Sequence, residues 1–315
     1  MKSQADIHYG VIGMGPIGTT IAAMLRKAGR RVSVLCIDEV KTNALKDNRL
    51  TVSGELTADV KLTDVYMDMR QFLAGGLDFI LITTKSPDLP GLLTALKKHN
   101  PPENIIYVSV QNGLDVEEQI INQFGSAKAL RMVINMGCKL ITDYQVQVVF
   151  ALTQVLSRRE DVDPVKNQIL ADDLTSAGFP TELVRDYQVE VYKKVMLNSS
   201  LSTVCALTGL SMVNALNDEG LYHIVRQILV ESLAVGRAMG LALPPEFLEY
   251  ALKYLLRGGD HKPSMLVDVE MRRRLENDDH CGRILHYAEK LNVPVPVLQT
   301  VYYLTRNLEQ RTISH

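Results

Sequence analysis

A glycine-rich stretch near the N-terminus constrains the fold more than any other feature of this 315-residue chain. It follows a predicted buried strand, precedes a predicted helix that runs to Gly29, and reads Gly13-Met14-Gly15-Pro16-Ile17-Gly18, a match to G-x-G-x-x-G. In such a unit the first glycine permits the sharp turn, the second lets backbone N–H groups approach a pyrophosphate, and the third lets the helix pack closely on the strand. The helix N-terminus adds unpaired N–H donors and the positive end of its dipole. We therefore predict a dinucleotide-binding turn, against the alternative of a βαβ unit whose glycines serve packing alone.

The end of the next predicted strand, residues 31–37, indicates which dinucleotide the chain binds. Asp38 follows that strand and lies 20 residues after Gly18, where an acidic side chain hydrogen-bonds the adenosine ribose hydroxyls. A carboxylate at this place repels a 2′-phosphate, so Asp38 favours NADH over NADPH. Arg30, Arg31 and Lys41 are close in sequence, so accommodation of a phosphate stays open.

Strand and helix patterns alternate up to about residue 185. The apolar run from Leu77 ends at Thr84-Lys85, and the run from Ile105 ends at Gln111-Asn112-Gly113. Such runs are typical of parallel strands buried on both faces, and ligands bind at their carboxyl ends. We therefore place Lys85 and Asn112 beside the glycine turn, at the switch point of the sheet.

Beyond Asp186 the periodicity is helical. The predicted fold class is α/β: a Rossmann-like, doubly wound N-terminal sheet that binds the dinucleotide (1–185), then an all-helical substrate and catalytic domain (186–315). Within these domains we expect one strand over 145–156, one helix over 189–204, and a helix from Ser264 that contains or ends at Glu276. The substrate of such a two-domain enzyme is expected in the cleft between the domains.

Composition narrows the class of protein. The formal net charge of −2 gives no broad basic surface for binding nucleic acid. The sequence contains no apolar run of 18 residues, so we expect no membrane span. The four cysteines have no C-x-x-C spacing, which favours reduced thiols in the cytoplasm over disulfides or a metal site. Helical second domains often pair, so a homodimer is an open alternative.

Four polar residues of the second domain are candidates for chemistry. Lys194 and Asn198 are four residues apart, so on a helix they share a face that also carries apolar residues; the alternative is that Lys194 is solvated. Ser264 follows Pro263 and is expected to cap the next helix. Glu276 lies in a charge-rich run, where a solvated surface acid is the alternative.

Taken together, these stretches resemble the ketopantoate reductase (2-dehydropantoate 2-reductase) family over nearly the whole chain. The motifs that carry the resemblance are the glycine turn 13–18, Thr84-Lys85, Gln111-Asn112-Gly113, Lys194-x-x-x-Asn198, and Ser264-Met265-Leu266-x-Asp268 with Glu276. The resemblance implies a C-terminal domain like that of 6-phosphogluconate dehydrogenase and an NAD(P)H-dependent oxidoreductase on the route to pantothenate.

The resemblance also implies roles for individual residues. Lys194 would act as general acid, giving a proton to the keto oxygen of ketopantoate as hydride reaches the carbon from the nicotinamide. Glu276 would assist in positioning and proton chemistry and contact the cofactor, while Lys85 and Asn112 would line the cofactor and substrate site. The residues that would bind substrate are Asn198, Ser202, Ser264 and Asn112; those that would bind cofactor are Gly13, Met14, Gly15, Pro16, Ile17, Gly18, Asp38, Lys85, Asn112 and Glu276.

The chain departs from the family pattern at several places. Ser202 and His261 stand where the family has asparagine, Tyr192 stands where tryptophan is usual, and residues 145–152 match the family's hairpin poorly. Two alternatives to ketopantoate reduction therefore stay open. One is a reductase or dehydrogenase of another 2-oxo or 3-hydroxy acid, and the other is a non-catalytic dinucleotide sensor.

Overall fold

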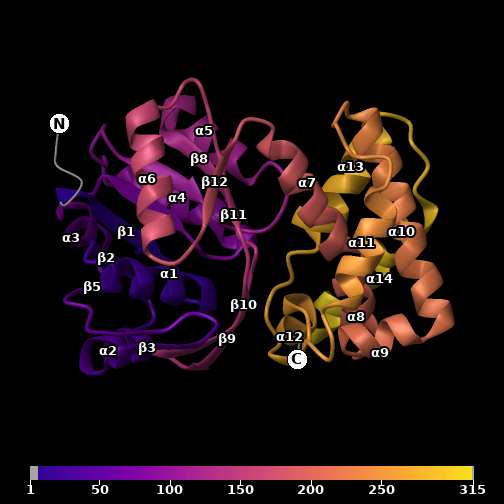
Figure 1. Cartoon of the computed structure of the whole chain (residues 1–315), viewed down its shortest axis with the longest axis horizontal. Coiled ribbons are helices and arrows are strands. Elements are labelled where there is room, and N and C mark those ends of the chain that lie inside the picture. Colours follow the sequence, from indigo (N-terminus) through magenta and orange to yellow (C-terminus); the bar gives the residue numbers. More distant parts are fainter. Residues whose placement is uncertain (1–5, 314–315) are drawn as a thin grey trace. The chain divides into compact units, whose positions relative to one another are not determined.

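The computed structural model describes residues 6–313, which form two compact units (Figure 1). The first, here called the sheet unit, comprises residues 6–111 and 115–187. The second, the helical unit, comprises residues 188–313 together with the short segment Asn112–Leu114. Residues 112–114 therefore belong to the helical unit, although the chain on both sides of them belongs to the sheet unit.

The main sheet of the sheet unit has eight strands in the order β12-β11-β8-β7-β6-β1-β2-β5. Their bounds are β1 (His8–Ile12), β2 (Arg31–Leu35), β5 (Asp64–Tyr66), β6 (Phe79–Ile82), β7 (Ile106–Ser109), β8 (Ala129–Val133), β11 (Gln154–Ser157) and β12 (Thr181–Val184). All neighbouring pairs are parallel except β11 with β8. The chain runs outward from β1 through β2 to β5 and then returns to β6 on the other side of β1, so the switch point lies beside β1, as predicted.

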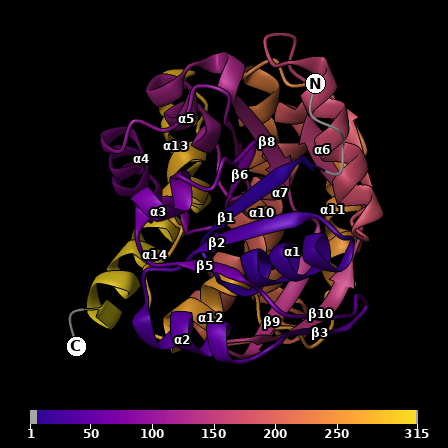
Figure 2. The same cartoon turned by 90° about the vertical axis from the view of Figure 1, so that its left-hand side faces the viewer.

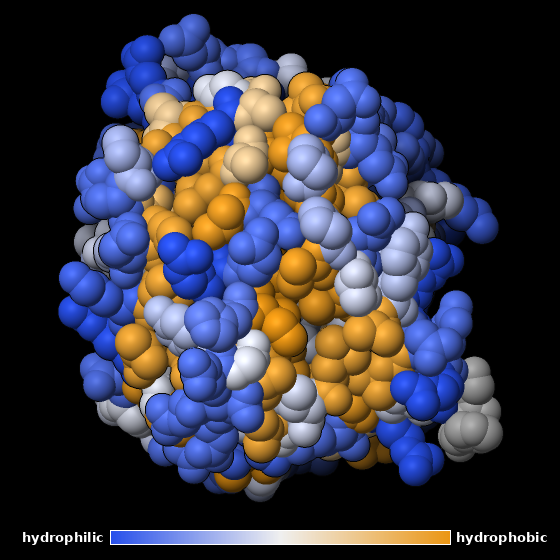
Figure 3. Space-filling model, turned by 90° about the vertical axis from the view of Figure 1, so that its right-hand side faces the viewer, coloured by the Kyte–Doolittle hydropathy of each residue, from blue (hydrophilic) through white to orange (hydrophobic). Residues whose placement is uncertain are grey.

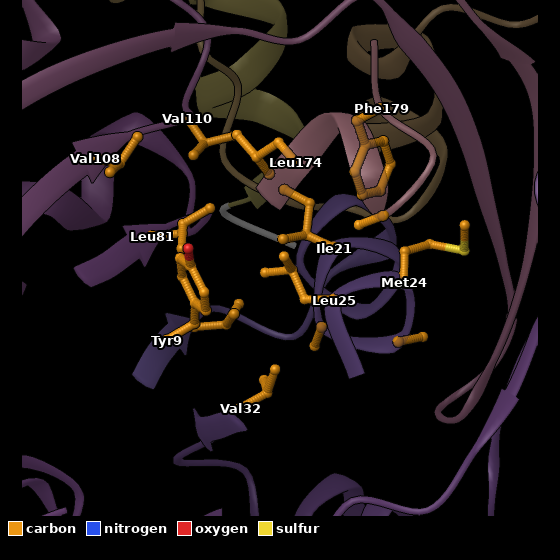
Figure 4. Packing of buried hydrophobic residues seen from close by; sticks show 14 of the residues in the cluster. Tyr9, Ile21, Met24, Leu25, Val32, Leu81, Val108, Val110, Leu174 and Phe179 are labelled. Atoms are coloured by element: carbon orange, nitrogen blue, oxygen red, sulfur yellow. The ribbon is translucent and has the colours of Figure 1, made fainter. Parts of the chain in front are cut away.

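Helices cover both faces of this sheet (Figure 2). Apolar side chains of α1 (Pro16–Lys27) and α6 (Pro164–Ser176) pack on one face, where Ile21, Leu25 and Leu174 meet Tyr9 and Val108 (Figure 4). The other face packs against α3 (Met69–Leu73), α4 (Leu89–Lys98) and α5 (Val116–Phe124). The apolar strands are thus buried on both sides, as their sequences indicate.

A second, four-stranded sheet has the order β4-β3-β10-β9 and packs against α1. Its strands are β3 (Leu50–Gly54), β4 (Ala58–Val60), β9 (Met136–Thr142) and β10 (Gln145–Ala151), while α2 (Glu39–Asp47) precedes it in the chain. The prediction of one strand over 145–156 is therefore wrong. The chain leaves β10 at Ala151 and enters the main sheet as β11 at Gln154, because Leu152 N–H and Gln154 N–H donate to Asn135 and Pro180 instead of continuing the β10 ladder.

Buried polar contacts tie α6 to the central strand. Asp173 of α6 is fully buried, accepts a 2.6 Å hydrogen bond from Tyr9 Oη, and lies 2.7 Å from the Arg30 guanidinium. A buried carboxylate is stable only when its charge is compensated in this way. The guanidinium of half-buried Arg30 is therefore held by this carboxylate.

The helical unit contains eight α-helices. They are α7 (Tyr187–Leu197), α8 (Thr203–Thr208), α9 (Met212–Asn217), α10 (Glu219–Ala238), α11 (Phe247–Leu256), α12 (Ser264–Glu270), α13 (Arg283–Lys290) and α14 (Pro296–Ile313). Two π-helical turns interrupt this pattern: the first π turn is Asn198–Ser202 and the second is Asp278–Gly282. The single helix predicted over 189–204 is therefore broken by the first π turn.

None of the helices within residues 6–313 has the length and apolar character needed to cross a membrane. Cys36, Cys138, Cys205 and Cys281 are all free thiols. Burial raises the pKa of Cys138 to about 11 and that of Cys281 to about 12, so these thiols stay protonated near neutral pH.

Candidate active site

The three glycines of the turn between β1 and α1 have different local environments. Gly13 adopts a φ of +100°, and a Cβ atom there would lie 2.6 Å from the backbone N of Thr84. A Cβ at Gly18 would lie 2.0 Å from Gly13 O. Gly15 has an ordinary φ of −70°, and a Cβ there would meet nothing within 4 Å. The protein itself thus requires glycine at 13 and 18, whereas the open space over Gly15 fits the close approach of a pyrophosphate.

The start of α1 also fits a bound anion. Gly15 is the N-cap residue and makes no side-chain capping bond, and Pro16 occupies the first helical position. The first N–H groups of any helix lack intrahelical acceptors, so those of Ile17 and Gly18 are available to a phosphate. The residues of this turn therefore fit the dinucleotide that the motif predicts.

Thr83, for which the sequence predicted no role in the site, holds the turn in place. It directly follows β6, and its hydroxyl donates to Ile12 O at 3.0 Å and to Gly13 O at 2.5 Å. The neighbouring Thr84 hydroxyl is buried and has no hydrogen-bond partner within residues 6–313. A threonine that ends a buried apolar strand next to the switch point was the available signal for both residues.

Asp38 is exposed at the end of β2 and caps α2, accepting a 2.9 Å hydrogen bond from Lys41 N–H. Its carboxylate keeps acceptor sites for a ribose hydroxyl, because one capping bond uses a single lone pair.

The basic residues close to Asp38 in sequence are engaged or lie elsewhere. Arg30 binds buried Asp173. Arg31 pairs with His8 at the opposite end of the parallel strands, roughly 13 Å along the strand from Leu35. Lys41 Nζ lies 3.8 Å from Asp143. Neither arginine thus lies where a 2′-phosphate beside Asp38 would need it.

Lys85 and Asn112 follow neighbouring parallel strands, β6 and β7. Lys85 is half-buried and precedes a short 3₁₀ turn, Ser86–Asp88. Asn112 lies within the helical unit, where its Nδ2 donates to Glu276 Oε2 at 3.5 Å. Leu114 N–H donates to Asp279 O at 3.1 Å and holds the same loop. Two residues predicted for the site, 164 positions apart, are thus brought into contact.

Lys194 and Asn198 lie one turn apart, Lys194 near the end of α7 and Asn198 at the start of the first π turn. Both are half-buried, and Ser202 at the end of that turn is 8% exposed. A π turn replaces the i→i+4 register by i→i+5, so Asn198 and Ser202 do not repeat the helical spacing of Lys194 and Asn198. Such turns are frequent at functional sites. Tyr192, by contrast, is core: its hydroxyl donates to Ser232 O at 2.8 Å.

Two sequence expectations about α12 are wrong. Ser264 does not cap the helix: Pro263 is the N-cap residue and Ser264 the exposed first residue. The helix also ends at Glu270, because Arg272 takes a φ of +52° and Arg273 N–H donates back to Asp268 O. Glu276 therefore lies on a non-helical segment, where it is 8% exposed rather than a solvated surface acid.

The first π turn lies at the centre of these elements in the helical unit. It contacts α12, which begins with Ser264, and the second π turn, which begins two residues after Glu276. Cys281 Sγ on the second π turn lies 3.6 Å from Ser199 O on the first, which joins the two turns directly. His261, three residues before Ser264, is half-buried, and burial lowers its pKa.

The groups in this set are chemically complementary to a 2-oxo acid. Lys194 is a cationic donor, Asn198 and Asn112 carry amide donors, and Ser202 and Ser264 carry hydroxyls. Such donors bind carboxylate and keto oxygens and stabilise negative charge that develops on them. Glu276 is the acidic member, and its carboxylate accepts a hydrogen bond from Asn112.

Comparison with known proteins identifies the family of this chain. The family model "Ketopantoate reductase PanE/ApbA" matches residues 9–158, and its C-terminal counterpart matches residues 186–309. The 2-dehydropantoate 2-reductase of Nostoc sp. is 28% identical, with 96% of this chain and 95% of that protein covered.

Solved structures share the fold. The PanE/ApbA family ketopantoate reductase of Ralstonia eutropha superposes with a TM-score of 0.87 at 22% identity and covers 98% of this chain and 100% of its own. A D-mandelate dehydrogenase solved with NADH and anilino(oxo)acetate has a TM-score of 0.86 at 18% identity and covers 97% of this chain and 99% of its own. The two family matches span most of the chain, and with them we conclude that it belongs to the ketopantoate reductase family of NAD(P)-dependent oxidoreductases that act on CH–OH groups.

Proposed function

We propose that this protein reduces ketopantoate to pantoate, using NADH, with Lys194 as the general acid. The observation that carries the proposal is the hydrogen bond between Asn112 and Glu276, which joins the motif after β7 to the acidic residue of the catalytic set. Its context is a chain whose relatives over almost their full length are 2-dehydropantoate 2-reductases.

Each candidate residue of the helical unit has a defined part in this proposal. Bound NADH supplies the hydride that reduces the keto carbon. Lys194 donates its proton to the keto oxygen, and its charge stabilises the alkoxide that develops there. Asn198, Ser202 and Ser264 orient the substrate by hydrogen bonds, and Asn112 holds the Glu276 carboxylate in place near the lysine.

Cofactor binding falls to the sheet unit. The backbone of residues 13–18 binds the pyrophosphate, and Lys85 lines the same edge of the sheet. Asp38 accepts from the adenosine ribose and repels a 2′-phosphate. The commitment of Arg30 to Asp173, and the position of Arg31 at the other end of β2, support the preference for NADH.

Steady-state rates with ketopantoate, measured with NADH and with NADPH, test both parts of the proposal. We expect turnover with both cofactors and a higher kcat/KM with NADH. A clear preference for NADPH would overturn the role of Asp38, and no turnover with either cofactor would overturn the substrate assignment.

A second candidate function is that of a reductase or dehydrogenase that acts on another 2-oxo or 3-hydroxy acid. Ser202 and His261 differ from the family pattern at the substrate positions, and the chain also resembles a mandelate dehydrogenase in fold. A panel of branched, aromatic and straight-chain 2-oxo acids separates the candidates by kcat/KM. A non-catalytic sensor would bind NADH without turning over any of them.

We further propose that the protein is cytoplasmic and that it forms a homodimer. The thiols, all free and three of them buried, support a cytoplasmic protein. Several apolar areas lie on one face of the helical unit (Figure 3), and the exposed large apolar side chains of this unit support a homodimer; they are Tyr250, Leu256, Met271, Leu291, Tyr303, Leu304 and Ile313. Light scattering on the purified protein gives the mass that decides between monomer and dimer.

A further inference from the structure

A buried cation in the sheet unit has no part in the roles assigned above. Arg131 on β8 is 2% exposed. Its Nη1 donates to Ser109 Oγ on β7 at 2.9 Å, and its Nε lies 3.9 Å from the carboxylate of Glu117 on α5. Burying an arginine and a carboxylate costs more than burying apolar side chains of the same size. Stability alone is therefore a poor reason for this pair.

The contact between Arg131 and Ser109 has a fixed direction, and it continues to Gln111. A guanidinium only donates, so the Ser109 oxygen must accept from it. The one O–H of Ser109 then donates to Gln111 Oε1, at 2.9 Å. This direction also determines which end of the Gln111 amide faces Ser109, namely the oxygen.

The Gln111 side chain accepts this bond from Ser109 through its amide oxygen. Gln111 is only 5% exposed, and its Nε2 has no hydrogen-bond partner within residues 6–313. Gln111 directly precedes Asn112, whose amide reaches Glu276. The orientation of Gln111 therefore sets where the loop that carries Asn112 begins.

The rest of that loop has little freedom to compensate. Gly113 has a φ of +110°, and Asp115 has a φ of +57°, which is uncommon for a residue other than glycine. Leu114 N–H is bound to Asp279 O between them. A shift at Gln111 would thus be passed to Asn112 rather than absorbed by the loop.

We propose that Arg131 and Ser109 are positioning residues that act through Gln111 to hold Asn112 in contact with Glu276 and with the substrate. This inference rests on the proposed function, because it assigns Asn112 to the substrate site. Arg131 and Ser109 are 2% and 0% exposed, so their part is to position Gln111 rather than to bind a ligand.

The test compares two buried serines that both bind Arg131. Ser109→Ala removes the hydroxyl between Arg131 and Gln111. Ser157→Ala is the matched control: Ser157 on β11 is equally buried, and its Oγ accepts from the Arg131 backbone N–H at 2.8 Å without a contact to Gln111. Each variant loses one buried hydrogen bond to Arg131, and only Ser109→Ala breaks the connection to Asn112.

We expect Ser109→Ala to raise the KM for ketopantoate about 10-fold, the effect of roughly one lost buried hydrogen bond, with the Kd for NADH changed less than about 2-fold. Ser157→Ala should leave both constants within about 2-fold, and Ser109→Thr, which keeps a hydroxyl, should restore most of the KM. In an Asn112→Ala background the added Ser109→Ala change should alter KM by less than about 2-fold, because the residue through which it acts is gone.

Amide hydrogen exchange of Leu114 gives a readout that does not depend on turnover. Ser109→Ala should speed this exchange about 10-fold, and Ser157→Ala should not. If the wild type fails to reduce ketopantoate, the proposed function fails, whereas the exchange result still decides the coupling from Ser109 to the loop.

Three results would overturn the inference: unchanged exchange and KM in Ser109→Ala, equal changes in Ser157→Ala, or full additivity with Asn112→Ala. Should Ser109→Ala fail to fold, Gln111→Met removes the acceptor of the same bond at similar size, and the same shifts are expected.

Discussion

The glycine turn of the sheet unit and the candidate catalytic set of the helical unit are built from different materials. The turn is six consecutive residues, and it presents backbone N–H groups together with the open space over Gly15. The catalytic set consists of side chains from α7, the first π turn, α12, the segment before the second π turn, and the loop after β7.

This difference separates two kinds of specificity. A backbone site is defined by local geometry and tolerates little change in main-chain shape, as the close contacts at Gly13 and Gly18 demonstrate. A side-chain site assembled from five segments can change one group, such as Ser202, without changing the fold. The first kind suits a cofactor shared by many enzymes, and the second suits a substrate that differs between them.

Lys194 is the residue that tests whether the helical unit supplies the proton. Lys194→Ala should lower kcat by about 100-fold or more, as for loss of a positioned general acid, with the Kd for NADH little changed. Lys193→Ala is the matched control, since Lys193 pairs with Glu190 at 2.8 Å and lies near the Phe247 ring. Single-turnover rates of both variants check this, and near-normal turnover in Lys194→Ala would remove the lysine from the mechanism.

Substitutions at Gly15 and Gly18 distinguish a glycine needed for cofactor binding from a glycine needed for folding. Gly15→Ala should leave the free energy of unfolding within about 0.5 kcal/mol, because its Cβ meets open space, but weaken NADH binding about 10-fold or more by occupying that space.

Gly18→Ala should instead destabilise the protein by about 1–3 kcal/mol, since its Cβ would overlap Gly13 O. Denaturant unfolding and NADH titration of both variants measure the two effects. Equal losses of stability in both variants would contradict a ligand-related reason for Gly15.

The smallest expected effect concerns pH and compares one histidine in each unit. Burial lowers the pKa of His8 in the sheet unit and of His261 in the helical unit below the ordinary value of 6.5. The unfolded chain therefore takes up these protons first as the pH falls. The stability that each neutral imidazole contributes is fully present above pH 6.5 and is lost as the pH falls from there to its folded-state pKa.

His8→Gln, whose amide can still reach the Ser33 hydroxyl, should make the Tm less dependent on pH below 6.5. His261→Asn should also make the Tm less dependent on pH in this range, because burial lowers the pKa of His261 in the same direction. Thermal unfolding between pH 5 and 8 measures both slopes. A steeper slope in His8→Gln than in the wild type would reverse the assigned direction.

The parts of this protein that could be predicted from the amino-acid sequence are those set by local interactions. Residues 9–18 specify a strand, a turn that needs a left-handed φ, and a helix start, and each of these is set by neighbours within a few positions. The apolar runs that end at Lys85 and Asn112 likewise predicted parallel strands and their ligand-binding edge, because burial on both faces leaves a continuous apolar pattern.

The contacts between residues far apart in the chain could not be predicted, because they depend on how the segments pack together. The contact of Asn112 with Glu276 joins residues that are 164 positions apart in the sequence. The ion pair of Arg30 with Asp173 also joins residues far apart in the sequence, so neither contact leaves a periodic signal. Packing also overrode helical periodicity at Asn198–Ser202 and at Arg272, where a π turn and a left-handed residue replace the expected helices. Local propensity is worth a few tenths of a kcal/mol per residue, and burying side chains among several segments outweighs it.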